Sequence, residues 1–279
     1  MRIAFFGTPD FVTQFLDTLT EHSYTPGLII TGPDVPVGRK LTMTSPAPKE
    51  WAKEKGIPYL QPEKITDDFI ESLKKENFDL FVVVAYGKIL PEALITLPRL
   101  GTINVHYSLL PKYRGATPVE SAILAGDTET GISIQQMVYE LDAGAVLTEK
   151  KVPIGREETH IDLRNKLNQE ALPLLVETVQ SLEVGTARPV AQDESKKSIC
   201  KKIKKEHGLV DLTEQGEILY RKYRAYFGWP GIFFFDTKQD RQMRIKIGTA
   251  HMEDEKFVID TVIPEGKNQM KYSDYLNWK

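Results

Sequence analysis

The sequence predicts an α/β protein with a mostly parallel sheet covered by helices on both sides, followed by a small β-rich C-terminal domain. Short apolar runs alternate with helical stretches over residues 2–106, which is the pattern of parallel-sheet proteins. The run LFVVVA at residues 80–85 is apolar without interruption, as in a strand that is covered on both faces. After residue 185 the chain becomes rich in lysine and then in aromatic residues, which indicates a linker and a second domain.

The N-terminal elements follow from hydrophobic spacing. Residues 2–6 form an apolar strand, and the apolar positions Phe11, Phe15, Leu16 and Leu19 then recur as on one face of a helix. Residues 32–46 contain several prolines and glycines and are expected to form a loop. Further strands are expected at 28–31, 58–60, 80–85 and 101–106, with helices at 48–55, 67–75 and 90–95.

The pattern changes after Arg114. A short helix is expected near 119–124, followed by two apolar segments, 131–139 and 145–153, that are typical of a pair of strands ending the sheet. Residues 159–182 form a long amphipathic helix, which Pro173 is expected to interrupt because proline lacks a backbone N–H.

The C-terminal third is expected to form a small β-barrel-like module. A helix near 214–227 precedes candidate strands at 232–235, 243–247 and 257–262. The resulting domain boundaries are 1–184 for the large domain, 185–206 for a basic linker and 207–279 for the small domain.

Composition excludes several classes of protein. The chain has 279 residues, 41% hydrophobic and 27% charged, which is an ordinary globular balance. No stretch approaches the roughly 20 apolar residues of a membrane span, and residues 1–10 lack the apolar core of a secretory signal, so we expect a soluble cytoplasmic protein without a membrane partner. Cys200 is the only cysteine and the five histidines have no metal-ligand spacing; we therefore expect no disulfide and no metal.

Charge is distributed unevenly. The net charge is −3, but residues 191–279 carry 17 Lys and Arg against 14 Asp and Glu. Six lysines lie between Lys196 and Lys205, interleaved with Ile199 and Ile203. Such a run is the best candidate for contact with a polyanion, although most lysine runs are simply solvated surfaces. The aromatic residues Phe227, Trp229 and 233–235 are suited to RNA stacking or, more commonly, to the core of a small barrel.

The residues with catalytic potential lie in the segment 101–147. Asn104 and His106 are two apart on a predicted strand, so both side chains emerge on one face at the strand's C-terminal end, where open α/β sheets bind ligands. An Asn and a His aimed at one point can donate two hydrogen bonds to a developing oxyanion, and Asp142 on a later loop can orient the His or accept a proton. On spacing alone, a buried Asn tying down a turn and a His bonded to backbone is the commoner explanation.

Two neighbouring loops are less specific. Residues 108–111 (SLLP) supply apolar bulk and a rigid turn, suited to a flat aromatic ligand or to a hydrophobic plug. Ser108 lacks the GxSxG setting of a nucleophile, which disfavours covalent catalysis. Residues 7–10 (GTPD) lack the GxGxxG pattern, so we expect a structural turn there.

Four short motifs occur together in this segment, as N-x-H, S-L-L-P-x-x-R-G, T-G and L-D-x-G. This combination resembles the signature of the 10-formyltetrahydrofolate-dependent formyltransferases. Several stretches are similar to the members that act on initiator tRNA: MRIAFFGTPDF, PDVPVGR, GIPYLQPEKI, VVVAYGKILP, QDESK, KIKKEHGLVD, PEGKNQM and DYLN. The resemblance covers essentially the whole chain.

The resemblance implies a Rossmann-like formyltransferase domain and a shortened C-terminal β-barrel related to the OB-fold. Asn104 and His106 would bind and polarise the formyl oxygen, and Asp142 would assist proton transfer. The formyl donor would be 10-formyltetrahydrofolate, with no metal. The folate would be held by three loops, at Val84, Ala85, Tyr86 and Gly87, at Ser108, Leu109, Leu110 and Pro111, and at Tyr139, Leu141 and Ala143.

The resemblance also implies an acceptor, the α-amine of methionyl initiator tRNA, and therefore a role in translation initiation, as a monomer. The tRNA would contact Arg39 and Lys40 and the linker lysines Lys201, Lys202, Lys204 and Lys205. The loop 38–43 has fewer basic residues than the family usually carries, and the C-terminal domain is short. A sugar N-formyltransferase, a formyltetrahydrofolate hydrolase and a non-catalytic RNA- or folate-binding module therefore remain as alternatives.

Overall fold

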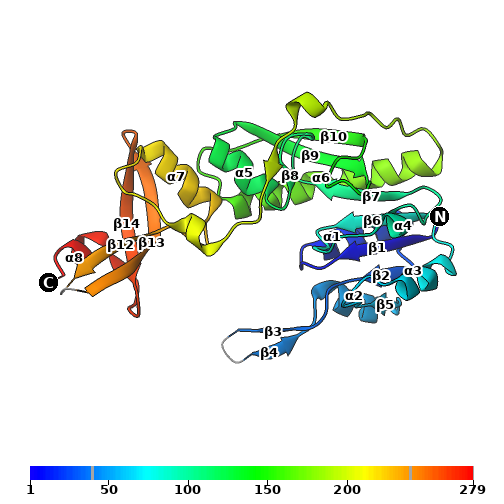
Figure 1. The fold of residues 1–279 in the computed structure, drawn as a ribbon, viewed down its shortest axis with the longest axis horizontal. Helices are drawn as coiled ribbons and strands as arrows, with labels where there is room; N and C mark the ends of the chain where they lie inside the picture. Colours follow the sequence, from blue (N-terminus) through cyan, green and yellow to red (C-terminus); the bar gives the residue numbers. More distant parts are fainter. Residues whose placement is uncertain (39–40, 239–240, 279) are drawn as a thin grey trace. The chain divides into compact units, whose positions relative to one another are not determined.

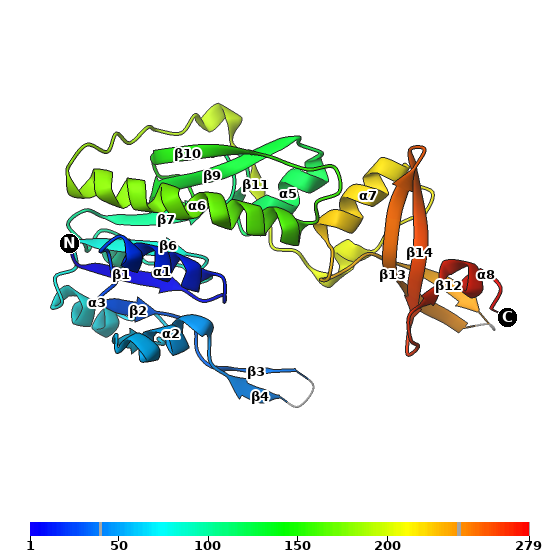
Figure 2. The same ribbon diagram turned by 180° about the vertical axis from the view of Figure 1, so that it is seen from behind.

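The computed structural model describes residues 1–38, 41–238 and 241–278. It confirms the predicted class, with an α/β sheet in the N-terminal part and an antiparallel sheet at the C-terminus (Figures 1 and 2). Two compact units are present, and they interleave along the sequence. Unit 1 contains residues 1–114, 131–151 and 167–198, and unit 2 contains 115–130, 152–166 and 199–279. The sequence boundaries 1–184, 185–206 and 207–279 do not coincide with these units and stay a prediction.

The main sheet has seven strands in the order β10-β9-β7-β6-β1-β2-β5. The middle strands pair in parallel, and β9 runs antiparallel to β7 at the predicted end of the sheet. The strands are β1 (Ile3–Gly7), β2 (Leu28–Ile30), β5 (Tyr59–Leu60), β6 (Leu80–Val84), β7 (Thr102–His106), β9 (Glu129–Gln136) and β10 (Val146–Pro153).

Every residue of β1 and β6 is buried, because helices cover both faces of the sheet. Ala4 and Phe6 pack on the face covered by the third and fourth helices, while the alternate residues Ile3 and Phe5 point to the opposite face and are also buried. The helices of the N-terminal part are α1 (Val12–Glu21), α2 (Ala47–Lys55), α3 (Asp67–Lys74) and α4 (Glu92–Ile95).

The long helix α6 (His160–Glu183) runs without a break through Pro173, so the predicted interruption is wrong. Proline removes one helical hydrogen bond, at a cost of about 3 kcal/mol. Burial of Leu163, Leu167, Leu174 and Leu175 along one face offsets that cost. A packed apolar face therefore outweighs the local preference of one residue.

Residues 32–46 are also more regular than predicted. They form an antiparallel hairpin of β3 (Val35–Val37) and β4 (Thr42–Thr44), which extends away from the sheet in both views (Figures 1 and 2). Its base is tied down where Lys49 Nζ donates to both carboxylate oxygens of Asp34, at 2.8 and 2.7 Å, and Gln61 Nε2 donates to Asp34 Oδ1 at 2.9 Å. Alternating β-branched residues explain the hairpin.

In unit 2, α5 (Pro118–Ala125) packs against α7 (Gly216–Ala225). The C-terminal strands pair antiparallel in the order β12-β13-β14-β15, and within the described residues β12 and β15 do not pair to close a barrel. These elements are β12 (Phe233–Lys238), β13 (Arg241–Glu253), β14 (Lys256–Pro264), β15 (Met270–Lys271) and α8 (Tyr272–Leu276).

β13 and β14 are longer than predicted and form one hairpin. The turn residues Asp254 and Glu255 have φ of 45° and 63°. Two consecutive left-handed residues match the right-handed twist of the flanking strands, so the pairing continues to the turn. Most of the residues between the strands expected at 243–247 and 257–262 therefore belong to the two strands.

The segment expected to be a linker is bound to the protein at several points. Val190 pairs with Val146 through two backbone hydrogen bonds, and β11 (Ile199–Cys200) pairs with β8 (Arg114–Gly115). Short 3₁₀ helices, η1 (Glu194–Lys196) and η2 (Lys205–Gly208), precede and follow this strand. Backbone hydrogen bonds to the rest of the protein therefore fix the path of residues 190–200.

Candidate active site

Asn104 and His106 lie at the C-terminal end of β7 in the middle of the sheet. Asn104 is aligned with Val83 on β6 and with Gln135 on β9, and His106 is aligned with Ser133. Asn104 is half-buried, and among the residues that the structure describes its amide forms no hydrogen bond. The amide is therefore available to a ligand.

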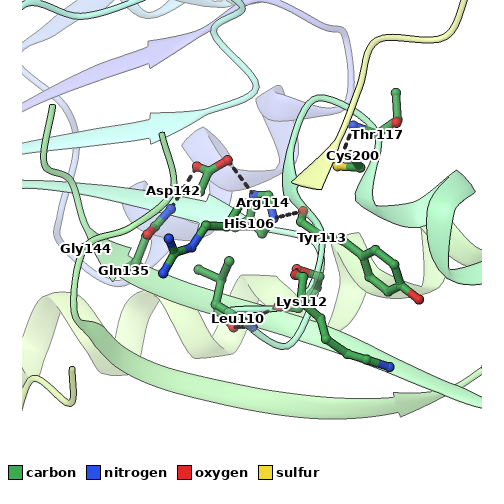
Figure 3. A network of polar contacts seen from close by, with 12 residues as sticks. His106, Leu110, Lys112, Tyr113, Arg114, Thr117, Gln135, Asp142, Gly144 and Cys200 are labelled. Carbon is green, nitrogen blue, oxygen red and sulfur yellow. Dashed lines mark hydrogen bonds and ion pairs between the residues drawn. The ribbon is translucent and has the colours of Figure 1, made fainter. Parts of the chain in front are cut away.

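The imidazole of His106 is held at both nitrogens. Nε2 lies 2.9 Å from the carbonyl oxygen of Tyr113. Because that oxygen can only accept, Nε2 carries the hydrogen. Nδ1 lies 3.7 Å from Asp142 Oδ2, an ion pair when the ring is protonated (Figure 3). The His106 side chain is 5% exposed and that of Asp142 11%, so the pair is largely shielded from water.

The loop that carries Asp142 is bent sharply back onto β9. Asp142 has φ of 49°, a left-handed conformation that non-glycine residues adopt only when their surroundings enforce it. Gln135 Nε2 donates to Asp142 Oδ1 at 2.9 Å. A Cβ on Gly144 would lie 1.6 Å from the carbonyl oxygen of Gln136, so only glycine fits there. The L-D-x-G pattern thus has a geometric cause.

Two further residues, which sequence reasoning did not select for this site, hold the same loop. Gln192 Nε2 donates to the carbonyl oxygens of Asp142 and Gly144, at 2.8 and 2.7 Å. Arg114, 1% exposed, donates to Gln192 Oε1 from Nε at 3.0 Å and from Nη2 at 2.8 Å, and pairs with Glu194. The sequence signals were the place of Arg114 in the S-L-L-P-x-x-R-G motif and that of Gln192 in the stretch QDESK.

Comparison with known proteins identifies the family. Residues 1–179 match the model of the formyl transferase family, and residues 202–258 match that of the formyl transferase C-terminal domain. The chain belongs to the formyl transferase family. The expected family resemblance is therefore confirmed, and the chain is an enzyme of this kind.

Relatives of this formyl transferase have similar sequences over most of their length. The methionyl-tRNA formyltransferase of Sulfurovum sp. (strain NBC37-1) is 41% identical over 262 residues, covering 93% of this chain and 84% of that one. The methionyl-tRNA formyltransferase of Halalkalibacterium halodurans is 43% identical over 231 residues, covering 82% and 73%.

A solved structure also shares the fold. It is an N-formyltransferase from Helicobacter canadensis, in complex with folinic acid and dTDP-3-aminofucose, and it superposes with a TM-score of 0.67. The match covers 93% of this chain and 95% of that one, but only 17% of residues are identical. This likeness supports the fold alone.

The residues expected to hold folate differ in accessibility. Val84, the last residue of β6, and Tyr86 in the following loop are buried. Ala85 and Gly87 are exposed in left-handed conformations, with φ of 50° and 78°. Tyr86 packs edge-on against Phe6, and burial raises the pKa of its hydroxyl to about 12. The side chain of Tyr86 is thus part of the core, whereas Ala85 and Gly87 are open to a ligand.

The loop after β7 is mostly turned inward. Ser108 is buried and donates from Oγ to the Lys112 carbonyl at 2.5 Å; Leu110 is also buried, and Leu109 and Pro111 are half-buried. By contrast, Tyr139 is 69% exposed and Leu141 61% exposed on the loop that carries Asp142, where Ala143 is half-buried. These two side chains offer accessible apolar surface beside the catalytic residues.

The linker lysines fall into two groups. Lys196 and Lys197 pair with Asp193 and Glu194, each at 3.0 Å. Lys201, Lys202, Lys204 and Lys205 are exposed, and none of the four forms an ion pair with a residue that the structure describes. The other two residues expected to contact tRNA, Arg39 and Lys40, lie outside the described residues.

The described residues also line a cavity away from the catalytic residues. A cavity of about 370 Å³ is lined by Asp79 and Arg99, which precede β6 and β7, at the edge of the sheet opposite Asn104.

Over residues 1–38, 41–238 and 241–278, no cluster of three His, Cys, Asp or Glu is arranged to hold a metal ion. No helix in those ranges has the length and apolarity needed to cross a membrane.

Proposed function

We propose that this formyl transferase moves the formyl group of 10-formyltetrahydrofolate to the α-amine of methionyl initiator tRNA, in the cytoplasm, for translation initiation. The observation that carries formyl transfer is the free amide of Asn104 beside the shielded pair of His106 and Asp142. The acceptor is supported by relatives that carry the name methionyl-tRNA formyltransferase and are 41% and 43% identical over 93% and 82% of this chain.

Asn104 and His106 stabilise the charge that develops in the reaction. The neutral amine attacks the formyl carbon, a C–N bond forms, and negative charge collects on the formyl oxygen. The Asn104 amide donates to that oxygen without first giving up a partner. His106 exchanges its hydrogen bond to the Tyr113 carbonyl for one to the oxyanion, which is favourable because a charged acceptor makes the stronger bond.

Asp142 accepts the proton of the attacking amine. Its carboxylate faces His106 Nδ1 and keeps a positive ring paired while the oxyanion exists. The carboxylate then accepts the proton that the attacking amine loses, directly or through water. When the oxyanion collapses, the bond between the formyl carbon and N10 breaks. N10 takes up the proton that Asp142 received from the amine, which restores the carboxylate, and the formylated amine leaves.

The surface of the protein offers matching contacts for both substrates. Tyr139 and Leu141 present apolar area for the flat folate rings, together with the exposed backbone of Ala85 and Gly87. The unpaired lysines at 201–205 suit the phosphates of tRNA. Arg39 and Lys40 join them in the proposal by position in the sequence, and the enzyme is proposed to act as a monomer.

A sugar N-formyltransferase is the second candidate. The observation that favours it is the fold shared with the Helicobacter canadensis enzyme, whose structure contains dTDP-3-aminofucose. That likeness rests on 17% identity, and it offers no role for the unpaired lysines.

The deciding experiment compares acceptors. Purified enzyme is given 10-formyltetrahydrofolate with charged initiator methionyl-tRNA, uncharged tRNA, free methionine or a dTDP-linked amino sugar, and formylated product is quantified. We expect product with the charged tRNA only. Formylation of the sugar but not of the tRNA would replace the proposed acceptor with the second candidate.

A further inference from the structure

Gln192, a residue outside the catalytic trio, contacts the catalytic loop at two backbone positions. It lies between α6 and η1, 50 residues after Asp142 in the sequence. Its Nε2 donates to the Asp142 carbonyl at 2.8 Å and to the Gly144 carbonyl at 2.7 Å, and lies 3.4 Å from Gln135 Oε1. One amide group thus holds the backbone on both sides of Ala143.

The orientation of this amide is set by Arg114. The guanidinium donates two hydrogen bonds to Gln192 Oε1, so the oxygen faces Arg114 and the NH₂ group faces the loop. Arg114 itself is buried and fixed by Glu194. Because Arg114 is buried and donates two hydrogen bonds to Oε1, the Gln192 amide has little freedom to rotate.

The loop needs such support because its conformation is strained. A left-handed conformation is unfavourable for a non-glycine residue and persists only where surrounding contacts enforce it. From β9, the side chain of Gln135 holds Asp142 by a bond to Oδ1. The two bonds from Gln192 to backbone carbonyls resist rotation of the Asp142 peptide, and that rotation would carry the carboxylate away from His106 Nδ1.

We propose that Gln192 is a positioning residue for formyl transfer, which holds the Asp142 loop so that the carboxylate faces His106. The proposal rests on the catalytic roles assigned above to His106 and Asp142. Gln192 contacts neither substrate in this scheme, and it acts only through Asp142. Its removal therefore lowers the rate of the chemical step without weakening substrate binding.

The segment that carries Gln192 also holds the residue that bonds to the second nitrogen of the His106 ring. Ser198 Oγ accepts from the Tyr113 N–H at 2.9 Å, and the Ser198 carbonyl accepts from the Arg114 N–H at 2.9 Å. Tyr113 supplies the carbonyl that accepts from His106 Nε2. Residues 192–198 thus fix the partners of both ring nitrogens, which gives this part of the linker a place in the active site.

The test compares Gln192→Ala and Gln192→Glu with Gln169→Ala, a matched control on α6. The Gln169 amide donates to exposed Gln14 and to no other described residue. Gln192→Glu keeps an oxygen for Arg114 but places a second oxygen against two carbonyls. We expect both Gln192 variants to lower kcat for formyl transfer to methionyl initiator tRNA about 10- to 100-fold, with KM for both substrates changed less than about twofold. The control and the melting temperatures of folded variants serve to exclude a general loss of stability.

A double variant separates positioning from a structural role. In an Asp142→Ala background, adding Gln192→Ala should change kcat by less than about twofold, because Gln192 has nothing left to position. A full additional loss in the double variant, or unchanged kcat in Gln192→Ala, overturns the proposal. If Asp142→Ala itself leaves transfer intact, the proposed catalytic roles fail instead, and the two failures are distinguishable.

Hydrogen exchange supplies a readout that does not depend on activity. The amides of residues 142–145 should exchange faster in Gln192→Ala than in the parent protein, while those of β6 and β7 stay unchanged. Equal exchange in the loop would show that Gln192 does not hold it, whatever the acceptor of the enzyme is.

Discussion

The first prediction concerns the side-chain amide of Asn104 as a donor to the oxyanion. Because the amide bonds to none of the residues that the structure describes, Asn104→Ala removes an oxyanion contact and little else. We expect kcat to fall by about 10²- to 10³-fold while the Kd of the folate donor changes far less. Single-turnover formylation and a fluorescence titration with the donor measure the two quantities. A kcat within about fivefold of the parent would remove Asn104 from the oxyanion site.

Asp142→Asn isolates the charge of the carboxylate. The substitution keeps Oδ1 as an acceptor for Gln135 but removes the negative charge opposite His106 Nδ1 and the site for the amine proton. We expect kcat to fall about 10²- to 10⁴-fold with donor binding retained. Glu149→Gln is the control, since Glu149 is an exposed carboxylate on β10 that forms no ion pair with a residue the structure describes. Equal effects of the two changes would argue against a catalytic carboxylate.

At the scale of elements, the start of α6 combines a cap with a buried titratable group. Thr159 and Asp162 form a reciprocal capping box: the Asp162 carboxylate accepts from the Thr159 N–H at 3.0 Å and from Oγ1 at 2.6 Å, and Thr159 Oγ1 accepts from the Asp162 N–H at 3.3 Å. These bonds, from the side chain first and then from the backbone, lower the pKa of Asp162.

Thr159→Ala should reduce the free energy of unfolding by about 1 kcal/mol, because it leaves a backbone N–H of the first turn without its acceptor. Urea unfolding at neutral pH measures the loss. Since the pKa of Asp162 is lowered on folding, its contribution is present above the ordinary pKa of an Asp and is lost as pH falls through the folded value. Thr186→Ala, which removes only a weak 3.4 Å bond, should have a much smaller effect.

The buried side chain of His160, the first residue of α6, is expected to make the free energy of unfolding sensitive to acid. Burial lowers its pKa, partly opposed by Glu120, and Nδ1 has no partner among the described residues. The folded chain therefore resists taking up a proton that the unfolded chain binds near 6.5, so stability is present above that value and falls as pH drops below it. Arg164 and Asp162 also act on the ring, with opposite signs.

The prediction is checked by urea unfolding at about pH 7.5 and about pH 5.5, a window chosen above the range in which most carboxylates titrate. The parent protein should lose stability between the two values, and His160→Gln should lose less. If both proteins lose the same amount, another group is responsible for the acid sensitivity.

For the whole molecule, the division of linker lysines into paired and unpaired groups predicts where RNA binds. The double variant Lys201→Ala/Lys202→Ala should weaken binding of initiator tRNA and lower the slope of log K against log salt by about 1 to 2, because each phosphate contact contributes close to one unit. Lys196→Ala/Lys197→Ala is the matched control, as Asp193 and Glu194 already neutralise these two charges. Binding at several salt concentrations gives both slopes, and equal slopes would place the RNA elsewhere.

The sequence by itself determined the features whose cause is local. Strand and helix periodicity is set within about ten residues, and so the alternation of strands and helices, the edge pair β9–β10 and the shared face of Asn104 and His106 were predictable. The four motifs were likewise sufficient for the family, because their combination is specific.

The tertiary structure decided what depends on contacts between distant residues. The continuity of α6 through Pro173 follows from the apolar surface on which it packs, and no local pattern contains that information. Gln192 and Arg114 are 78 residues apart, and Gln192 reaches the Asp142 loop across 50 residues. Hydrogen bonds at such separations leave no periodicity in the sequence, so only the folded chain shows that part of the apparent linker supports the catalytic loop.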